Sequence, residues 1–198
     1  FTEQGRCFWL RVYEIPEASK VAAGRVIQNI INLPQDDRVK AYIPIQDLND
    51  EEFIKNNYIM FCTRQGTIKK TLVQDFSRPR SNGINAITIH EGDMLLEARL
   101  TNGNNEIIIA NRKGRAIRFN ESKVRSMGRN AAGVRGMTLV GPNDGVVGMV
   151  CVDPNDMLVT IFVVSEGGNG KRTALEDYRV TNRGGKGVKT MKITEKTG

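Results

Sequence analysis

Four segments of the chain repeat one order of apolar and polar positions. Each segment opens with an apolar, strand-like stretch, followed by a turn glycine and a short strand in which apolar and polar residues alternate. A second glycine ends the basic loop that follows, and alternation then resumes, as in residues 83–89, 133–139 and 187–193. Period-two alternation bounded by Gly, Asn and Asp predicts half-buried antiparallel strands joined by hairpins.

The two glycines of each repeat lie at nearly constant spacing. We assign the turn glycines to Gly5, Gly66, Gly114 and Gly170, and the second glycines to Gly24, Gly83, Gly133 and Gly187, which lie 19, 17, 19 and 17 residues further on. The repeats occupy approximately residues 1–50, 58–104, 106–152 and 158–198. A period of about 50 residues with four strands per unit predicts an all-β, propeller-like fold of repeated four-stranded blades. A two-sheet sandwich with accidental repeats is the alternative, and the four matching glycine pairs favour blades.

Helical periodicity is nearly absent from the sequence. Residues 50–55, Asp-Glu-Glu-Phe-Ile-Lys, predict one or two capped helical turns. No apolar run approaches the roughly 18 residues of a membrane-spanning helix, so we expect a soluble protein. No basic region followed by an apolar region opens the sequence at Phe1, so nothing in it marks the chain for secretion.

Basic residues are concentrated in the middle of the chain. The whole chain has 29 basic and 22 acidic residues, a net charge of +7. Residues 64–135 hold 14 basic against 6 acidic residues, whereas the segments before and after have net charges of −2 and +1. A surplus of this size in one third of the chain favours a polyanionic partner, although a solvated basic face is the alternative.

These cations recur beside the glycines of successive repeats. Equivalent positions in stacked repeats face the same side, so we expect the charges to line a curved rim. Long cations and glycine N–H groups reach phosphate oxygens without reading bases, and aromatic residues for stacking are few, which favours double-stranded DNA bound without strong sequence preference. The candidate DNA-binding residues are Lys69, Lys70, Arg78, Arg80, Arg112, Lys113, Arg115, Arg118, Lys123, Arg125, Arg129, Arg135, Lys171, Arg172, Arg183 and Lys186.

No catalytic constellation is evident. The acidic residues are scattered, and no nucleophile lies in a recognisable pattern with a base. Residues 165–172 superficially resemble a phosphate-binding P-loop, but Ser165 and Arg172 stand where that motif requires Gly and Ser or Thr. The stretch also lies between two expected strands, so we interpret it as a hairpin turn. We therefore expect no catalytic residue and no cofactor in this chain.

The cysteines indicate neither disulfides nor a metal site. Cys7, Cys62 and Cys151 are odd in number, far apart and set in apolar stretches, a pattern typical of reduced, buried thiols. With His90 as the only histidine, a metal ion would need mostly carboxylate ligands, which is uncommon for structural sites. We expect no metal site and a cytoplasmic location.

Several long runs resemble the C-terminal domain of the DNA gyrase A protein, part of a type IIA topoisomerase. They are residues 5–18, 66–71, 119–128, 133–136 and 170–174, and the similarity extends over essentially the whole chain. The resemblance implies a six-bladed β-pinwheel whose basic outer rim wraps DNA and directs negative supercoiling by the DNA gyrase holoenzyme. The four repeats counted here would be a portion of such a pinwheel.

The resemblance also implies partners that this chain does not contain. These are the N-terminal region of the gyrase A protein and the gyrase B protein in a heterotetramer, where other domains would use ATP and Mg²⁺. Residues 181–187, Thr-Asn-Arg-Gly-Gly-Lys-Gly, agree with the family's gyrase box, Gln-Arg-Arg-Gly-Gly-Arg/Lys-Gly, at five of seven positions. They lie in the fourth repeat, whereas the box normally precedes the part of the domain seen here, so we interpret them as a degenerate equivalent.

Two alternatives stay open at this point. The C-terminal DNA-binding domain of topoisomerase IV is related and usually has fewer or degenerate blades. The alternative from another functional class is a non-catalytic propeller that binds proteins and has incidental surface charge. This alternative predicts that binding does not depend steeply on salt.

Overall fold

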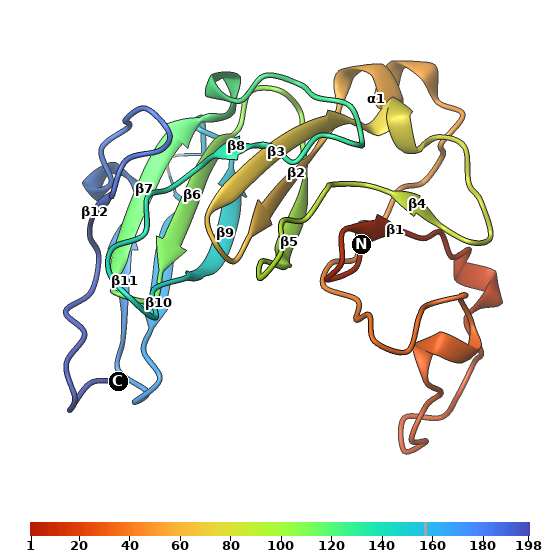
Figure 1. The fold of residues 1–198 in the computed structure, drawn as a ribbon, viewed down its shortest axis with the longest axis horizontal. Coiled ribbons are helices and arrows are strands. Elements are labelled where there is room, and N and C mark those ends of the chain that lie inside the picture. The colour runs from red at the N-terminus through yellow and green to blue at the C-terminus, as the bar shows by residue number, and fades with distance from the viewer. Residues whose placement is uncertain (157) are drawn as a thin grey trace.

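The computed structural model describes residues 1–156 and 158–198 as a succession of antiparallel sheets along an arch. Figure 1 shows the sheets following one another from β1 and β4 in one arm to β10 and β11 in the other. The N-terminus lies in the first arm and the C-terminus in the second. No helix among the described residues is long and apolar enough to cross a membrane.

Among the residues that the structure describes, two sheets have four strands and two have two strands. The first four-stranded sheet has the order β5-β2-β3-β8 and the second has the order β12-β7-β6-β9, while β1 pairs with β4 and β10 with β11. The bounds are β1 Arg6–Cys7, β2 Tyr58–Thr63, β3 Thr67–Leu72, β4 Ile84–Asn85, β5 Leu95–Thr101, β6 Glu106–Asn111, β7 Arg115–Asn120, β8 Val134–Arg135, β9 Val146–Val152, β10 Thr160–Val164, β11 Gly170–Ala174 and β12 Val188–Lys189. The prediction of an all-β fold with four-stranded blades is confirmed.

Short helices make up the remaining regular structure. The helix α1, Glu51–Asn56, begins after Asp50, whose carboxylate accepts a hydrogen bond from the Phe53 N–H at 3.0 Å, which confirms the capped turns expected from the sequence. Five 3-10 helices, Val12–Glu14, Ile27–Asn29, Val73–Phe76, Glu121–Lys123 and Leu175–Asp177, complete the described elements.

Three of the four described sheets take their last strand from the following repeat, and the β10–β11 sheet is the exception. β8 follows the second glycine of the third repeat, yet it pairs with β3 of the second repeat. In the same way β12 pairs with β7, and β4 pairs with β1. Gly133 permits this close pairing, because its φ is +105° and a Cβ there would lie 2.6 Å from the Ile68 carbonyl oxygen. A sequence repeat and a blade are therefore offset by one strand.

The turn glycine of the fourth repeat is Gly168, so our assignment to Gly170 is wrong. Gly168 has a φ of +78° and its N–H donates to the Ser165 carbonyl at 3.0 Å. The same bond closes the turn at Gly114, whereas Gly170 is the first residue of β11. Three nearby glycines made the turn ambiguous in sequence. The corrected alignment places Arg172 at the position that Lys70 and Arg118 hold in the earlier repeats.

The core is divided among the spaces between successive sheets. Along β2, Ile59 and Phe61 join the cluster next to the β1–β4 sheet, while Met60 and Cys62 join the cluster between the two four-stranded sheets. In β6, Ile108 likewise belongs to a third cluster that includes Leu175 and Tyr178 of the fourth repeat. Middle strands are thus buried on both faces, and any side chain on them points toward a neighbouring blade.

Candidate nucleic-acid interface

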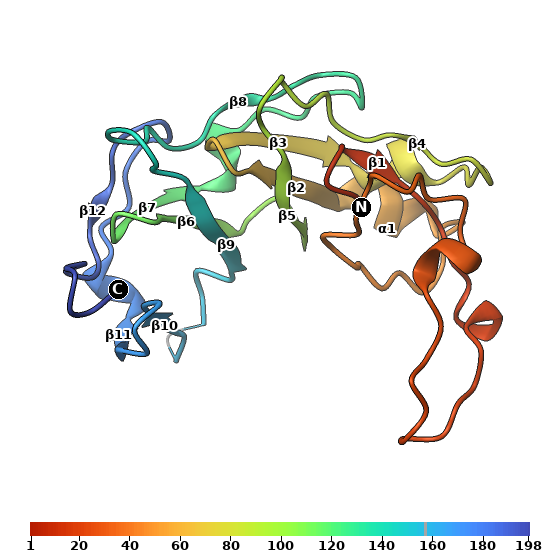
Figure 2. The same cartoon turned by 60° about the horizontal axis from the view of Figure 1, so that its bottom comes forward.

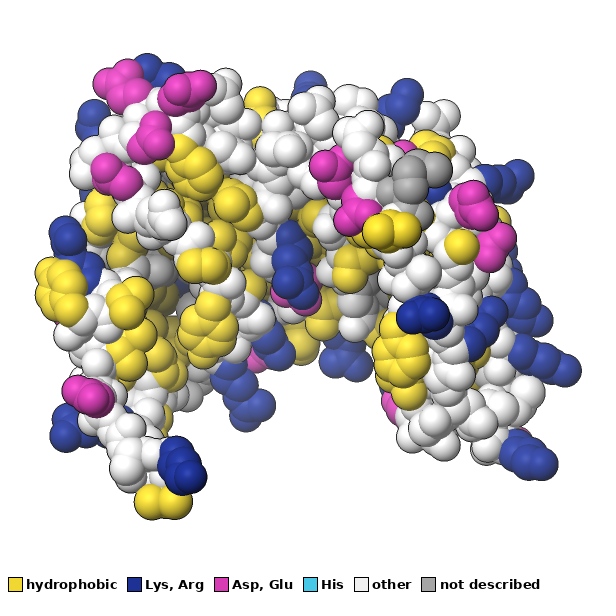
Figure 3. Space-filling view, turned by 180° about the vertical axis from the view of Figure 1, so that it is seen from behind, with side chains coloured by type: hydrophobic (Ala, Val, Ile, Leu, Met, Phe, Trp, Pro, Cys, Tyr) yellow, Lys and Arg dark blue, Asp and Glu magenta, His cyan; other side chains and the backbone are white. Residues whose placement is uncertain are grey.

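Three basic loops run along one edge of the arch. They cover residues 77–83, 124–133 and 178–187, and each connects a 3-10 helix to the strand that its repeat adds to the preceding sheet. In Figure 2 the segments that lead to β4, β8 and β12 follow the outer edge of the arch. Figure 3 shows Lys and Arg side chains projecting from the outer margin of the arm that carries the third and fourth repeats.

Ten of the sixteen candidate cations are exposed: Arg78, Arg80, Arg112, Lys113, Lys123, Arg125, Arg135, Lys171, Arg172 and Lys186. Arg112 is paired with Glu166 at 3.1 Å, with both side chains largely in solvent. We use the name basic rim for the exposed cations of the three loops and of β8 and β12, together with Lys123 beside the second loop, namely Arg78, Arg80, Lys123, Arg125, Arg135, Arg179, Lys186 and Lys189. These side chains are accessible to a phosphate backbone.

Lys69, Lys70 and Arg118 do not lie on the rim, which corrects our expectation for these three residues. Lys69 is fully buried and Lys70 is 7% exposed. The Arg118 side chain is 12% exposed, and its guanidinium is bonded inside the fold. The repeat pattern located these cations correctly along the chain, but alternation in a strand buried on both faces turns them toward neighbouring blades.

Lys70 and Arg118 connect consecutive repeats through equivalent contacts. The Lys70 ammonium donates to the Glu121 backbone carbonyl at 3.3 Å and lies 3.6 Å from the Glu121 carboxylate. The Arg118 guanidinium donates to the Leu175 and Tyr178 carbonyls at 2.7 and 2.9 Å, and to the Glu106 carboxylate at 2.6 Å. Both cations therefore hold the 3-10 helix of the following repeat.

Arg115 and Arg183 are also bonded to backbone of another repeat. Arg115 donates to the carbonyls of Lys186 and Gly187 at 3.0 and 2.6 Å. Arg183 donates to the carbonyls of Lys123 and Arg135 at 2.9 and 3.0 Å. These bonds use two of the five N–H donors of each guanidinium, and through them both residues hold the loops that carry the basic rim.

Sequence reasoning missed Lys189 as a rim residue. Lys189 in β12 is exposed, and it holds the same position after Gly187 that Arg135 holds after Gly133. The signal was present in the sequence, because both residues stand two places beyond the second glycine of their repeat.

Arg129, the remaining candidate, is partly exposed in the loop of the third repeat.

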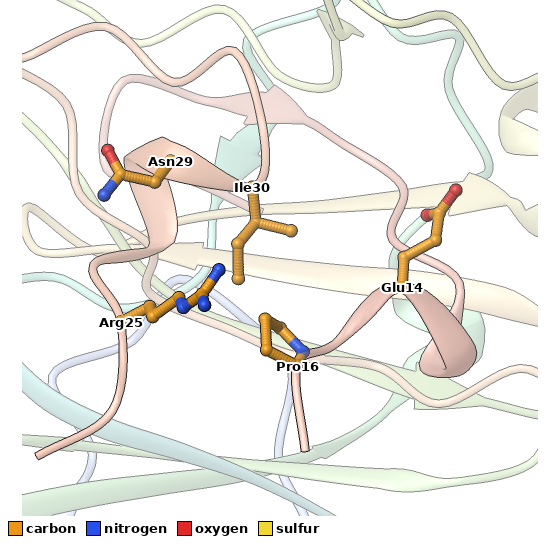
Figure 4. Close-up of a pocket in the computed structure, with 5 residues that line it drawn as sticks. All are labelled: Glu14, Pro16, Arg25, Asn29 and Ile30. Atoms are coloured by element: carbon orange, nitrogen blue, oxygen red, sulfur yellow. The ribbon is translucent and has the colours of Figure 1, made fainter. Parts of the chain in front are cut away.

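A hollow of about 690 Å³ lies in the first repeat. Glu14, Pro16, Arg25, Asn29 and Ile30 line it, and Figure 4 shows Arg25, Pro16 and Ile30 around its centre with the Glu14 carboxylate directed away. Its lining contains no nucleophile paired with a base. Over the described residues, no group of three or more His, Cys, Asp or Glu side chains is arranged to hold a metal ion.

We expect the three thiols to resist alkylation in the folded protein. All three cysteines are free, Cys7 and Cys62 are buried, and burial raises the pKa of Cys7 and of Cys151 to about 12. Burial raises the pKa of the Cys62 thiol as well. Because the thiolate is the reactive form, iodoacetamide at pH 8 followed by mass spectrometry is expected to modify none of them rapidly. Denaturant provides the control, since all three must then react; rapid modification of Cys62 in native buffer would contradict its burial.

Comparisons with known proteins agree with this geometry. The family described as "DNA gyrase C-terminal domain, beta-propeller" matches residues 1–46, 57–102, 105–153 and 160–198. The chain is 39% identical over 198 residues to the DNA gyrase A protein of Salmonella typhimurium and 43% identical over 199 residues to that of Staphylococcus epidermidis. The whole chain is matched in both cases, but it spans only 22% of the length of each relative.

Two solved structures share the arrangement of sheets. The C-terminal domain of DNA topoisomerase IV superposes with a TM-score of 0.82 at 31% identity, covering 95% of this chain and 56% of that one. The DNA gyrase A C-terminal domain superposes with a TM-score of 0.79 at 26% identity, covering 100% and 61% of the two chains.

Proposed function

The chain belongs to the DNA gyrase C-terminal domain family, and from this premise we propose that its basic rim binds and wraps double-stranded DNA without reading its sequence. The observation that carries the proposal is the recurrence of exposed cations on three loops along the outer edge of one arch. Cations spaced along a convex surface attract successive phosphates, and the curvature makes a bent duplex the best fit.

The character of the rim favours backbone contacts over base contacts. The loops carry Arg, Lys and glycines, and the 3-10 helices beside them have at most four residues, too short to enter a major groove. Contacts of this kind fix the path of a duplex and depend steeply on salt, but they carry no sequence information. Binding is therefore expected at any duplex sequence, with preference governed by how easily the duplex bends.

In the whole protein, we propose that this domain serves DNA gyrase. Wrapping would present a crossed DNA segment to the enzyme, so that ATP-driven strand passage introduces negative supercoils. The N-terminal region of the gyrase A protein and the gyrase B protein would be its partners in a heterotetramer, and those other domains would use ATP and Mg²⁺. A cytoplasmic location, where the chromosome of a bacterium lies, follows from the same proposal.

The topoisomerase IV counterpart is the second candidate. The superposition on the C-terminal domain of DNA topoisomerase IV, at 31% identity, favours it. The 39–43% identity to curated gyrase A proteins over the whole chain supports the gyrase assignment. Supercoiling by the holoenzyme distinguishes the two candidates, because only gyrase introduces negative supercoils.

The test of wrapping is a change in DNA topology. The chain is incubated with relaxed plasmid and a relaxing topoisomerase, protein is removed, and the topoisomers are resolved on agarose. Chiral wrapping is expected to shift the linking-number distribution in proportion to bound protein, because the wrapped turns are trapped during relaxation.

The control for this test is binding to a short duplex in parallel, with salt varied. Tight binding with an unchanged topoisomer distribution would show that this chain contacts DNA but does not wrap it. Affinity that does not depend on salt would instead favour the protein-binding alternative.

A further inference from the structure

Lys69 is a buried cation without a carboxylate partner among the described residues. It lies in the centre of β3, is fully buried, and its ammonium group forms two hydrogen bonds of 2.7 Å, to the backbone carbonyls of Ala86 and Arg129. Burying an ammonium group is costly, and in the third repeat the equivalent position in β7 is occupied by Ile117, which packs in the core. Folding alone does not require a lysine here.

The two carbonyls that Lys69 binds belong to segments that rest on each other. Ala86 follows β4 in the second repeat, and Arg129 lies in the basic loop of the third. Thr88 holds the same loop through its hydroxyl, which donates to the Asn130 carbonyl at 2.8 Å, and through its N–H, which donates to the Ala131 carbonyl at 3.2 Å. Lys69 thus supports the backbone of residues 129–131 from inside the sheet.

The next pair of repeats holds its loop by a different contact. Arg183 stands four residues before Gly187, as Arg129 stands four residues before Gly133. The Arg183 guanidinium binds two carbonyls of the third repeat. Among the described residues the guanidinium of Arg129 forms no hydrogen bond or ion pair, and only its carbonyl is engaged, chiefly by Lys69. Where a buried lysine holds the backbone, the arginine side chain is left available.

We infer that Lys69 is a positioning residue for duplex binding: it fixes the backbone of residues 129–131 of the following repeat and so presents the Arg129 guanidinium to a DNA phosphate. This inference rests on the proposed function of the basic rim. Lys69 itself does not touch DNA, since its ammonium group is enclosed by β3, the Ala86 segment and the loop.

The protonation of Lys69 offers an independent readout. Burial lowers its pKa to about 8, while Asp75 in the neighbouring 3-10 helix raises the pKa and Arg129 in the loop lowers it. Between pH 8 and the ordinary value of 10.5, the folded chain has released a proton that the unfolded chain retains. The free energy of unfolding must then rise with pH over this window, compared with that of a variant without the lysine.

The experiment compares Lys69→Ile, which installs the residue found at position 117, with Arg129→Ala and with the double variant. Lys69→Ile is expected to stay folded, to weaken binding of a short duplex at 0.1 M salt by roughly three- to tenfold, and to speed amide exchange at Thr88. Arg129→Ala is expected to weaken binding by a similar factor. In the double variant, the loss is expected to be no greater than in either single variant, because both act through one phosphate contact.

Three outcomes would overturn the inference. These are unchanged affinity of Lys69→Ile, unchanged affinity of Arg129→Ala, or losses that simply multiply in the double variant. If Lys69→Ile does not fold, the experiment uses Thr88→Val in its place, because this substitution loosens the same loop from outside the core. Unchanged duplex affinity of Thr88→Val would also contradict the inference. Failure of the proposed function is distinguishable, because the wild-type chain would then bind no duplex at all.

Discussion

Replacing Lys123, Arg125 and Arg135 together by alanine is expected to weaken duplex binding on the order of a hundredfold at 0.1 M salt. All three side chains are exposed on the basic rim of the third repeat, so their removal takes cations from the DNA path without opening the core. Each neutralised phosphate contributes about −0.9 to the slope of log K against log salt, so the slope should flatten by about 2.7. Fluorescence anisotropy of a labelled duplex over a salt series measures both quantities.

A matched variant separates the rim from net charge. Arg38, Arg64 and Arg99 are exposed but lie outside the three basic loops, and their replacement by alanine removes the same charge. This control is expected to retain most of the affinity and the slope, apart from a small long-range effect that salt screens. Equal losses in the two triple variants would show that binding follows total charge, and the rim assignment would then be wrong.

Removing the Arg118 side chain is expected to have the largest effect on stability. Arg118→Ala leaves the Glu106 carboxylate, on a residue that is 7% exposed, without its cation and takes the donor from the Leu175 and Tyr178 carbonyls. Breaking a buried pair on one side costs about 3–5 kcal/mol, because the remaining charge is desolvated without compensation. Chemical denaturation followed by circular dichroism measures the loss, and hydrogen exchange should show it first in β10 and β11.

The double variant Arg118→Met with Glu106→Gln is the control for this prediction. It removes both charges and keeps similar volumes, so much of the lost stability is expected to return. A double variant as unstable as Arg118→Ala would mean that the bonds to the two carbonyls, and not the ion pair, supply the stabilisation. Full stability of Arg118→Ala itself would contradict its role in joining the third and fourth repeats.

These two predictions divide the cations that sequence alone had grouped together. Arg118 and Lys123 are five residues apart, and both follow the turn glycine of the third repeat. In the structure Arg118 points into the space before the next blade, whereas Lys123 is exposed beside the loop. A charge reversal at Arg118 would therefore report on repeat packing, whereas a change at Lys123 reports on DNA contact.

The repeat architecture was readable from the sequence because its signals are local. Turn glycines such as Gly66 and Gly114 have positive φ, alternation marks the strands, and Asp50 caps α1 through a residue three places away. The concentration of charge in residues 64–135 is likewise a property of the chain itself. These features were sufficient to predict an all-β fold of repeated blades and to favour a polyanionic partner.

The role of each cation depended on the tertiary structure, because a strand from one repeat pairs with the sheet of the preceding repeat and brings together residues that are distant in sequence. Pairing of β8 with β3 brings the basic loop of the third repeat onto the second, and the middle strands become buried on both faces. Lys69 then binds a carbonyl 60 residues away, while Lys123 stays in solvent. Alternation specifies that neighbouring side chains point to opposite faces, but whether a face meets water or another blade depends on which repeats pack together.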